Sequence, residues 1–129
     1  MPLVQVARDR IAGLIVGVET CHWGDAKATI WVATSTAAHS GTSTWFGSAT
    51  TATWAATMET GFPARATNVL QFSGIFSTAV ANIQWEQWGI NTATSSSTGI
   101  LLNVAAQQAL GTKTSAQSWQ LTACVTITT

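Results

Sequence analysis

The sequence predicts an all-β fold, an antiparallel β-sandwich or jelly roll with a short N-terminal helix. Two observations predict the strands: the chain is rich in Thr, Val, Ile and Trp, which favour half-buried pleated surfaces, and its last stretch alternates between apolar and polar residues. A third observation argues against an α/β fold, because no repeated helical segments separate the apolar runs. With 129 residues the chain can bury one hydrophobic core, so we expect a single β domain over residues 1–129.

The N-terminal segment, residues 1–17, is expected to form a helix or arm. Pro2 suits the first turn of a helix, and apolar residues follow it at three- and four-residue spacing. These residues are Leu3, Ala7, Ile11, Leu14 and Ile15. Gly13 and Gly17 weaken the far end of the pattern, so the helix is expected to end near residue 14 or 16.

A first strand is expected from Thr29 to Ala33, a compact apolar run between turn-forming stretches. Residues 34–57 are rich in Thr, Ser and Ala, with a few aromatic residues. They fit either a loop-rich insertion or arm, or a strand, a loop and a second strand. Long loops in compact domains are often functional, whereas large aromatic side chains often cover a small protein's own core. Both interpretations remain open.

The second half of the chain carries clearer strand patterns. Leu70, Phe72 and Phe76 have the spacing that places them on one face of a strand. The apolar residues within 81–90 change parity, which indicates a bulge near Gln87. Two strands are therefore expected here, the second of them irregular.

Two more strands are expected toward the end of the chain. Residues 100–104 follow a turn-rich stretch, and residues 118–128 alternate between apolar and polar side chains. The apolar members of the last strand are Trp119, Leu121, Ala123, Val125 and Ile127. One face of that strand should be buried and the other polar. Roughly five to eight strands with irregular turns favour a sandwich or jelly roll.

The chain carries few charges: five Lys or Arg balance five Asp or Glu, and the charged fraction is 8%. Without net charge, no long-range field would draw nucleic acid or an anionic membrane, so neither is expected as a partner. A surface with so little charge is poorly protected against association, which favours a component of an assembly. The N-terminal segment also predicts no secretion signal and no membrane-spanning segment.

The sequence predicts no catalytic, cofactor or metal site, and therefore no enzyme. Its five acids form no motif that would place two carboxylates together on one element. Cys21, His22 and Asp25 lack the paired spacing of a zinc site, and a turn explains them better. Lys113 lies in a Gly-Thr-Lys-Thr string without the first glycine of a phosphate loop, so a polar turn is expected there.

Cysteine and tryptophan raise two further questions. Cys21 and Cys124 follow no disulfide pattern, and two buried free thiols are expected in preference to a bridge. Seven Trp residues keep a carbohydrate-binding module as a remote alternative, because sugars stack on exposed indole rings. The acids and amides that accompany such sites cannot be located.

Several short motifs follow one another through the chain, mostly in its second half. In order, they are Phe62-Pro63-x-Arg65, Asn68-x-Leu70-x-Phe72, Ala81-Asn82-x-x-Trp85-Glu86-x-Trp88-Gly89-Ile90, Gly99-Ile100-Leu101-Leu102-Asn103 and Leu110-Gly111-Thr112-Lys113-Thr114-Ser115-x-Gln117-x-Trp119-Gln120-Leu121-Thr122. Their order and spacing resemble a group of small tailed-phage virion proteins. The opening Ala7-Arg8-Asp9-x-Ile11-Ala12 is similar to the start of those proteins, whereas residues 34–57 match poorly. No single motif is specific.

The resemblance implies a non-enzymatic phage virion structural protein, a capsid decoration or cement protein that stabilises the shell at capsomer junctions. Such proteins are often jelly-roll domains. The implied partners are the major capsid protein and copies of the chain itself. The implied location is the outer surface of the phage capsid, after synthesis in the host cytoplasm. The same order of motifs is also similar to N-terminal domains of tail-collar fibre proteins, so tail or baseplate proteins are the alternative partners.

Contacts with such partners are expected from aromatic residues of the middle segment and from the N-terminal arm. The candidate residues are Leu3, Arg8, Arg10, Trp45, Phe46 and Trp54. Arg65 and Glu86 are candidates for an ion pair within or between subunits, although a solvated pair that contributes little is the more ordinary outcome.

Overall fold

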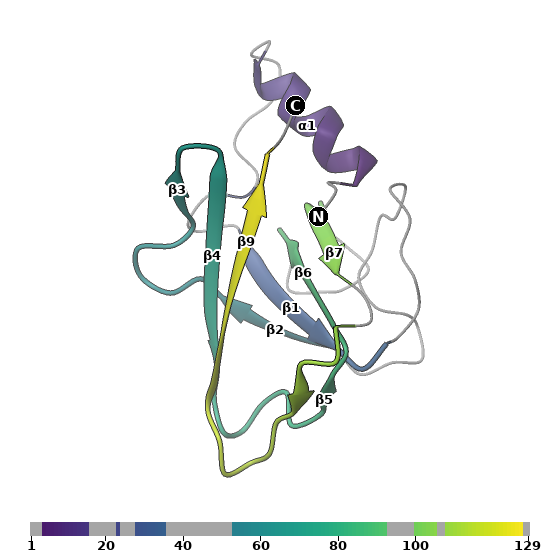
Figure 1. Ribbon diagram of the computed structural model, residues 1–129, viewed down its shortest axis with the longest axis vertical. Helices are drawn as coiled ribbons and strands as arrows, with labels where there is room; N and C mark the ends of the chain where they lie inside the picture. Colours follow the sequence, from purple (N-terminus) through teal and green to yellow (C-terminus); the bar gives the residue numbers. More distant parts are fainter. Residues whose placement is uncertain are drawn as a thin grey trace.

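The computed structural model describes residues 4–15, 23, 28–35, 53–92, 100–105 and 108–127. This part of the chain forms one helix and nine strands (Figure 1). Helix α1 spans Gln5–Ile15. The strands are β1 Thr29–Ala33, β2 Thr53–Thr57, β3 Ala64–Ala66, β4 Val69–Phe76, β5 Gln84–Trp85, β6 Gln87–Asn91, β7 Asn103–Ala105, β8 Gly111–Thr112 and β9 Trp119–Thr126. The predicted class, mostly β with a short N-terminal helix, is confirmed.

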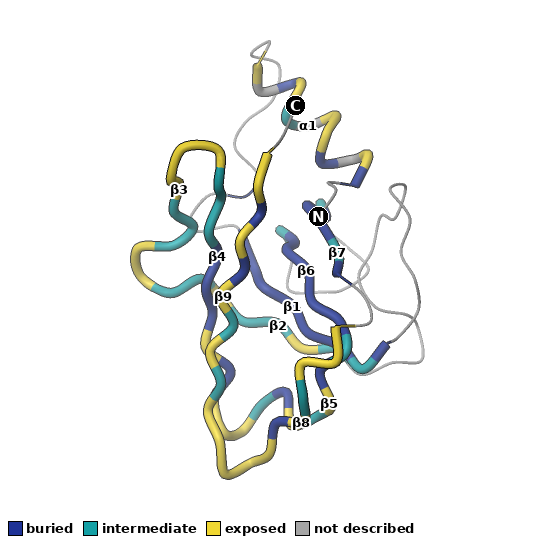
Figure 2. The backbone as a smooth tube through the Cα atoms, viewed as in Figure 1, coloured by how far each residue is buried: buried dark blue, intermediate teal, exposed yellow. Residues whose placement is uncertain are grey.

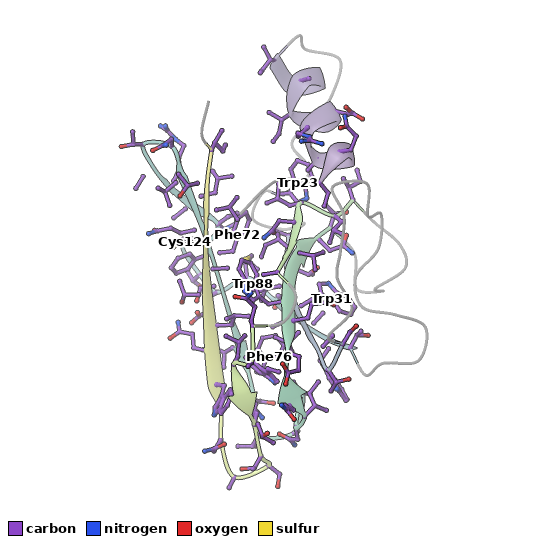
Figure 3. All side chains as sticks on the ribbon, turned by 45° about the vertical axis from the view of Figure 1, so that its right-hand side comes forward. Trp23, Trp31, Phe72, Phe76, Trp88 and Cys124 are labelled. Carbon is purple, nitrogen blue, oxygen red and sulfur yellow. The ribbon has the colours of Figure 1, made fainter. Side chains whose placement is uncertain are left out.

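The described strands form three antiparallel sheets. Sheet A has the order β2-β1-β6-β7, sheet B the order β3-β4-β9, and the small sheet C pairs β5 with β8. In Figure 3, Phe72, Phe76 and Trp88 lie between the long strands of sheet B and sheet A. The two larger sheets are thus packed like the layers of a sandwich.

The two larger sheets approach closely at Gly74 of β4. A Cβ atom there would lie 2.5 Å from Ile30 Cγ2 on β1 and 3.1 Å from Ala56 Cβ on β2. A side chain at that position would collide with both strands, so glycine allows the backbone of β4 to cross sheet A at this distance. The contact also fixes which face of β4 points inward.

The last strand follows the predicted alternation. Ala123 and Val125 on β9 are buried, whereas Gln120, Thr122, Cys124 and Thr126, which alternate with the inward-facing residues, are exposed. Figure 2 shows this alternation in the colours along β9. On β4, Phe72 and Phe76 are buried on the same inner face. These side chains belong to one hydrophobic cluster that also takes residues from sheet A, β5 and the N-terminal segment.

Helix α1 packs against this cluster at its first turn. Val4, just before the helix, is buried and donates its backbone N–H to the Leu102 carbonyl at 3.3 Å. Ala7 is fully buried, as the spacing predicted. Ile15 was expected on the same apolar face, but it is 81% exposed at the end of the helix. The predicted helix is confirmed, and among its described side chains Ala7 and the partly buried Ile11 contact the core.

The irregular strand predicted within residues 81–90 is two strands in different sheets. The chain leaves sheet C after β5 and enters sheet A with β6, and Glu86 lies between the two. The backbone N–H of Glu86 donates to the Ala33 carbonyl at the end of β1, at 2.9 Å. The prediction of a bulge near Gln87 was therefore wrong. The inward-facing positions shift there because the chain passes from sheet C to sheet A.

Two further segments were less sharply defined by the sequence. Residues 53–57 form β2 and pair with β1, which agrees with a strand at the end of residues 34–57, one of the two interpretations left open there. Residues 36–52 lie outside the described part of the chain. The strand predicted at residues 100–104 begins later, as β7, although the N–H of Leu102 already donates to the Ile90 carbonyl at 2.8 Å.

Candidate assembly surface

The outer face of sheet B, turned away from sheet A, is built by β4 and β9. The two strands pair along their whole length. Since Phe72 and Phe76 point inward, the residues that alternate with them point outward. They are Val69, Gln71, Ser73 and Ile75 on β4, and Gln120, Thr122, Cys124 and Thr126 on β9. None of these side chains carries a charge.

One edge of sheet B is formed by β9, and its hydrogen-bonding direction follows from two bonds. Just past the strand, the N–H of Ile127 donates to the Asn68 carbonyl at 2.9 Å. Along an antiparallel pair of strands, opposite residues that exchange backbone hydrogen bonds alternate with opposite residues that do not. Because Ile127 bonds to Asn68, the other odd-numbered residues of β9 also bond to β4. On β4, the Ser73 carbonyl accepts from the N–H of Glu59 at 2.9 Å, on the side away from β9, which agrees with this alternation. The even-numbered residues of β9 thus turn their N–H and C=O groups away from β4.

These outward-pointing groups belong to Gln120, Thr122, Cys124 and Thr126. Within the described part of the chain, no other strand pairs with them. The strand sequence WQLTACVT contains no charged residue, no Pro and no Gly. Natural edge strands are usually short, charged, bulged or interrupted by Pro, which prevents pairing with other chains. The β9 edge has none of these protections. We call this edge, together with the outer face of sheet B, the β9 surface.

A polar cluster holds one acid beside the β9 surface. Ser73 Oγ donates a hydrogen bond to the Glu59 carboxylate, and Gln120 Nε2 donates to Glu59 Oε2 at 2.6 Å. Ser73 Oγ also lies 3.1 Å from Thr122 Oγ1. Hydrogen bonds from Ser73 and then Gln120 hold the pKa of the Glu59 carboxyl below its usual value, against an opposing effect of desolvation. Through these hydrogen bonds the Glu59 carboxylate joins the segment after β2 to strands β4 and β9.

Two large apolar side chains are exposed near the ends of β9. Ile75, on the outer face opposite Gln120, is 52% exposed, and Ile127, directly after β9, is 43% exposed. Ile127 follows the inward parity of Ala123 and Val125, so it does not belong to the outer face. The other large exposed apolar residues among those described, Ile15, Trp54 and Leu110, lie on α1, on β2 and before β8.

The contact residues expected from sequence do not meet at one place. Arg8 is exposed on α1, where its guanidinium donates to Gln5 Oε1 at 2.8 Å. Trp54 is 40% exposed on β2, opposite Val32 of β1. Leu3, Trp45, Phe46 and the side chain of Arg10 lie outside the described residues. The β9 surface was not among the expected contacts, although its sequence signal, a strand free of charge with one polar face, was present.

The tryptophans that the structure describes are mostly buried. Trp23, Trp31, Trp85 and Trp88 are at most 9% exposed, and only Trp54 among the described tryptophans is an exposed large side chain. A stacking platform for sugars would need several exposed indoles, so the described tryptophans do not favour a carbohydrate-binding module.

Cys124 is exposed on the outer face of β9 as a free thiol, so the prediction that it is buried was wrong. The alternation of the strand explains the error, because Cys124 shares a face with Thr122 and Thr126. Cys21 lies outside the described residues.

Three charged residues have surroundings other than those expected. Lys113 was expected in a polar turn, but its side chain is 1% exposed. Arg65 Nη1 donates to the Thr67 carbonyl at 3.1 Å, and Glu86 accepts a hydrogen bond from Gln84. The ion pair suggested between Arg65 and Glu86 is therefore not formed within the chain, and a pair between subunits stays a prediction.

Comparisons with known proteins add no family. The chain matches no protein-family model, no curated protein and no solved structure. Within the described residues, no three His, Cys, Asp or Glu side chains gather as metal ligands would. No helix in the same part of the chain is long and apolar enough to cross a membrane.

Proposed function

We propose that this chain is a non-enzymatic structural protein of a tailed-phage particle, a capsid decoration or cement protein that stabilises the shell at capsomer junctions. The observation that carries the proposal is the β9 surface, where a face whose own strand side chains carry no charge adjoins an edge with no strand partner among the described residues. The one carboxylate at this face, Glu59, is hydrogen-bonded to Ser73 and Gln120. Covering uncharged side chains costs less desolvation free energy than covering ions. A free edge adds directional hydrogen bonds to a neighbour's sheet. Both properties suit repeated docking.

Several residues of the motifs that resemble phage virion proteins lie in the interior of the fold. Trp85, Leu101 and Lys113, taken from three of the motifs, are each at most 2% exposed. Their side chains hold the strands together and are not free to contact a partner. The contacts with a particle must then come from exposed residues, and the β9 surface supplies Ile75, Gln120, Thr122, Cys124 and Thr126.

The proposed role needs no reaction. Each copy would bury part of its surface across a seam between capsomers, with the major capsid protein and other copies of the chain as partners. A specific interface of ordinary size buries roughly 1,600 Å² in total. Because the shell is symmetric, every contact is repeated over the whole lattice. Modest free energies per copy then add up to resistance against the pressure of the packaged genome.

The location of the protein in purified particles tests the proposal. Phage heads are separated from tails, and the chain is quantified by mass spectrometry against the major capsid protein in each fraction. We expect on the order of hundreds of copies per head, as repeated binding over the lattice requires. A few copies confined to the tail fraction would contradict the cement role and favour a tail or baseplate component. Absence from both fractions would contradict a virion role altogether.

A further inference from the structure

We propose that the β9 edge binds the β9 edge of a second copy of this chain. The two strands would run antiparallel across a two-fold axis, and the two three-stranded copies of sheet B would become one continuous sheet. This inference rests on the proposed function for its biological setting and deepens it by naming the first partner of the β9 surface.

The other edges of the two large sheets are less suited to pairing. The opposite edge of sheet B is β3, which has 3 residues and carries the exposed Arg65. The edges of sheet A are β2, with 5 residues, and β7, with 3. Short and charged edges are protected against pairing. The β9 edge, with 8 residues and no charge, is the longest uncharged strand among these edges.

The alternation of hydrogen bonds selects the register. Only residues whose N–H and C=O point outward can bond to the second copy. One register uses all four of them in both copies: it places Thr122 opposite Cys124 of the second copy, and Gln120 opposite Thr126 of the second copy. Its centre is Ala123, whose side chain stays buried inside its own subunit. If the register shifted by two residues in either direction, one outward-pointing residue at the strand end would have no hydrogen-bonding residue of the second copy opposite it.

Electrostatics permit this pairing. No residue of β9 carries a charge, so no like charges meet across the axis. The nearest acid, Glu59, is bound to Gln120. In the proposed register the two Gln120 residues are six residues apart along the strand direction, about 20 Å at the usual rise per residue. That separation exceeds the screening length of roughly 8 Å at physiological salt, so the two carboxylates do not oppose the dimer.

The pairing is expected to stop at two copies and not to continue as a growing sheet, because a two-fold contact uses the β9 edge of both copies. A two-fold axis joins one β9 edge to one β9 edge and leaves only the β3 edges at the ends of the enlarged sheet. Since β3 is short and carries Arg65, the sheet stops there. The expected product is a dimer of finite size.

Charge substitutions on the exposed face of β9 test the partner and the register together. Thr122→Lys with Cys124→Lys would place like charges opposite each other twice, and Thr122→Lys with Cys124→Glu would place opposite charges there. Thr112→Lys adds a charge to an exposed side chain of β8, outside the β9 surface, and serves as the matched control. Sedimentation equilibrium, under reducing conditions, measures the dimer dissociation constant of each purified full-length variant. We expect the Lys/Lys variant to raise that constant about ten-fold or more, with the Lys/Glu variant and the control close to the unmodified protein.

Hydrogen exchange on the unmodified protein gives a second readout that does not depend on any variant folding. In the monomer the backbone N–H groups of the even-numbered β9 residues should exchange quickly and those of the odd-numbered residues slowly. Raising the protein concentration should slow the exchange of the even-numbered set alone. A monomer at all concentrations, or a dimer whose stability ignores both charge variants, would overturn the inference. These measurements use purified protein, so their failure would leave the test of the particle location unaffected.

Discussion

The ammonium of Lys113 donates a hydrogen bond of 2.7 Å to the side-chain oxygen of Asn82. A second bond of 2.9 Å runs from the same Nζ to the Val80 carbonyl, and the N–H of Lys113 donates to the Ile83 carbonyl at 3.1 Å. The lysine thus joins the segment after β8 to the connection between β4 and β5. In the sequence Lys113 resembles an ordinary surface charge, but in the structure it is buried and its hydrogen bonds stabilise the fold.

Removing this charge should destabilise the protein. Lys113→Met keeps much of the side-chain stem but leaves two oxygen acceptors without their donor. We expect the free energy of unfolding to fall by about 2–3 kcal/mol, the usual cost of leaving such groups unpaired. Urea denaturation measures this change. Arg8→Met, which removes a cation from the exposed side of α1, should change the stability by less than about 0.5 kcal/mol. Equal effects of the two substitutions would show that the Lys113 bonds contribute nothing.

The contact between sheets at Gly74 predicts a specific steric penalty. Gly74→Ala would place a methyl group 2.5 Å from Ile30 Cγ2, and the strain should cost about 1–3 kcal/mol. In an Ile30→Ala background the collision is largely removed, so the same glycine substitution should cost clearly less. A double-mutant cycle measured by denaturation tests this coupling. Strictly additive effects would contradict the close approach of β4 and β1.

The Glu59 cluster predicts a pH dependence. The folded protein lowers the pKa of the Glu59 carboxyl, so its ionised form is favoured by folding. The resulting stability is fully present above the ordinary glutamate pKa of roughly 4.3 and is lost as the pH falls through the lowered folded value. The stability advantage of the unmodified protein over Glu59→Gln, measured by denaturation from pH 7 to pH 3, should therefore shrink in acid. An advantage that grows in acid would have the wrong sign.

Two tryptophans should differ sharply in their contribution to stability. Trp85 is 2% exposed and packs edge-to-face on Phe76 at 4.9 Å and on Trp119 at 5.1 Å between ring centroids. Its indole N–H also donates to the Ala81 carbonyl at 2.9 Å. Trp85→Ala should cost about 3–5 kcal/mol, whereas Trp54→Ala, on the edge strand β2, should cost less than about 1 kcal/mol. Thermal or urea unfolding compares them, and similar losses would contradict the burial difference.

Strands with a local signal could be predicted from the sequence. The segment Thr29–Ala33 was placed correctly because it is a short apolar run between breakers, and β9 because its alternation is uninterrupted. Strand β2 has no such contrast, since its residues are Thr, Trp and Ala. Its pairing with β1 makes it a strand, and that contact joins segments distant in sequence.

The features that matter most for function depend on topology. The burial of Lys113 follows from acceptors supplied by a different loop, which composition cannot reveal. The exposed face of β9 could be predicted from alternation, but its edge position required the order of strands in sheet B. For that reason the sequence directed attention to aromatic residues such as Trp54 and away from Thr122 and Cys124.

A cryo-electron microscopy map of the intact particle tests the central claim most directly, because it locates both the chain and its strand edges. We expect the chain on the outer surface of the head, repeated with the capsid lattice, with the β9 edge paired to a neighbouring strand. A map with no copies on the head, or with copies whose β9 edge faces solvent throughout, would contradict the assignment of the β9 surface as the assembly site.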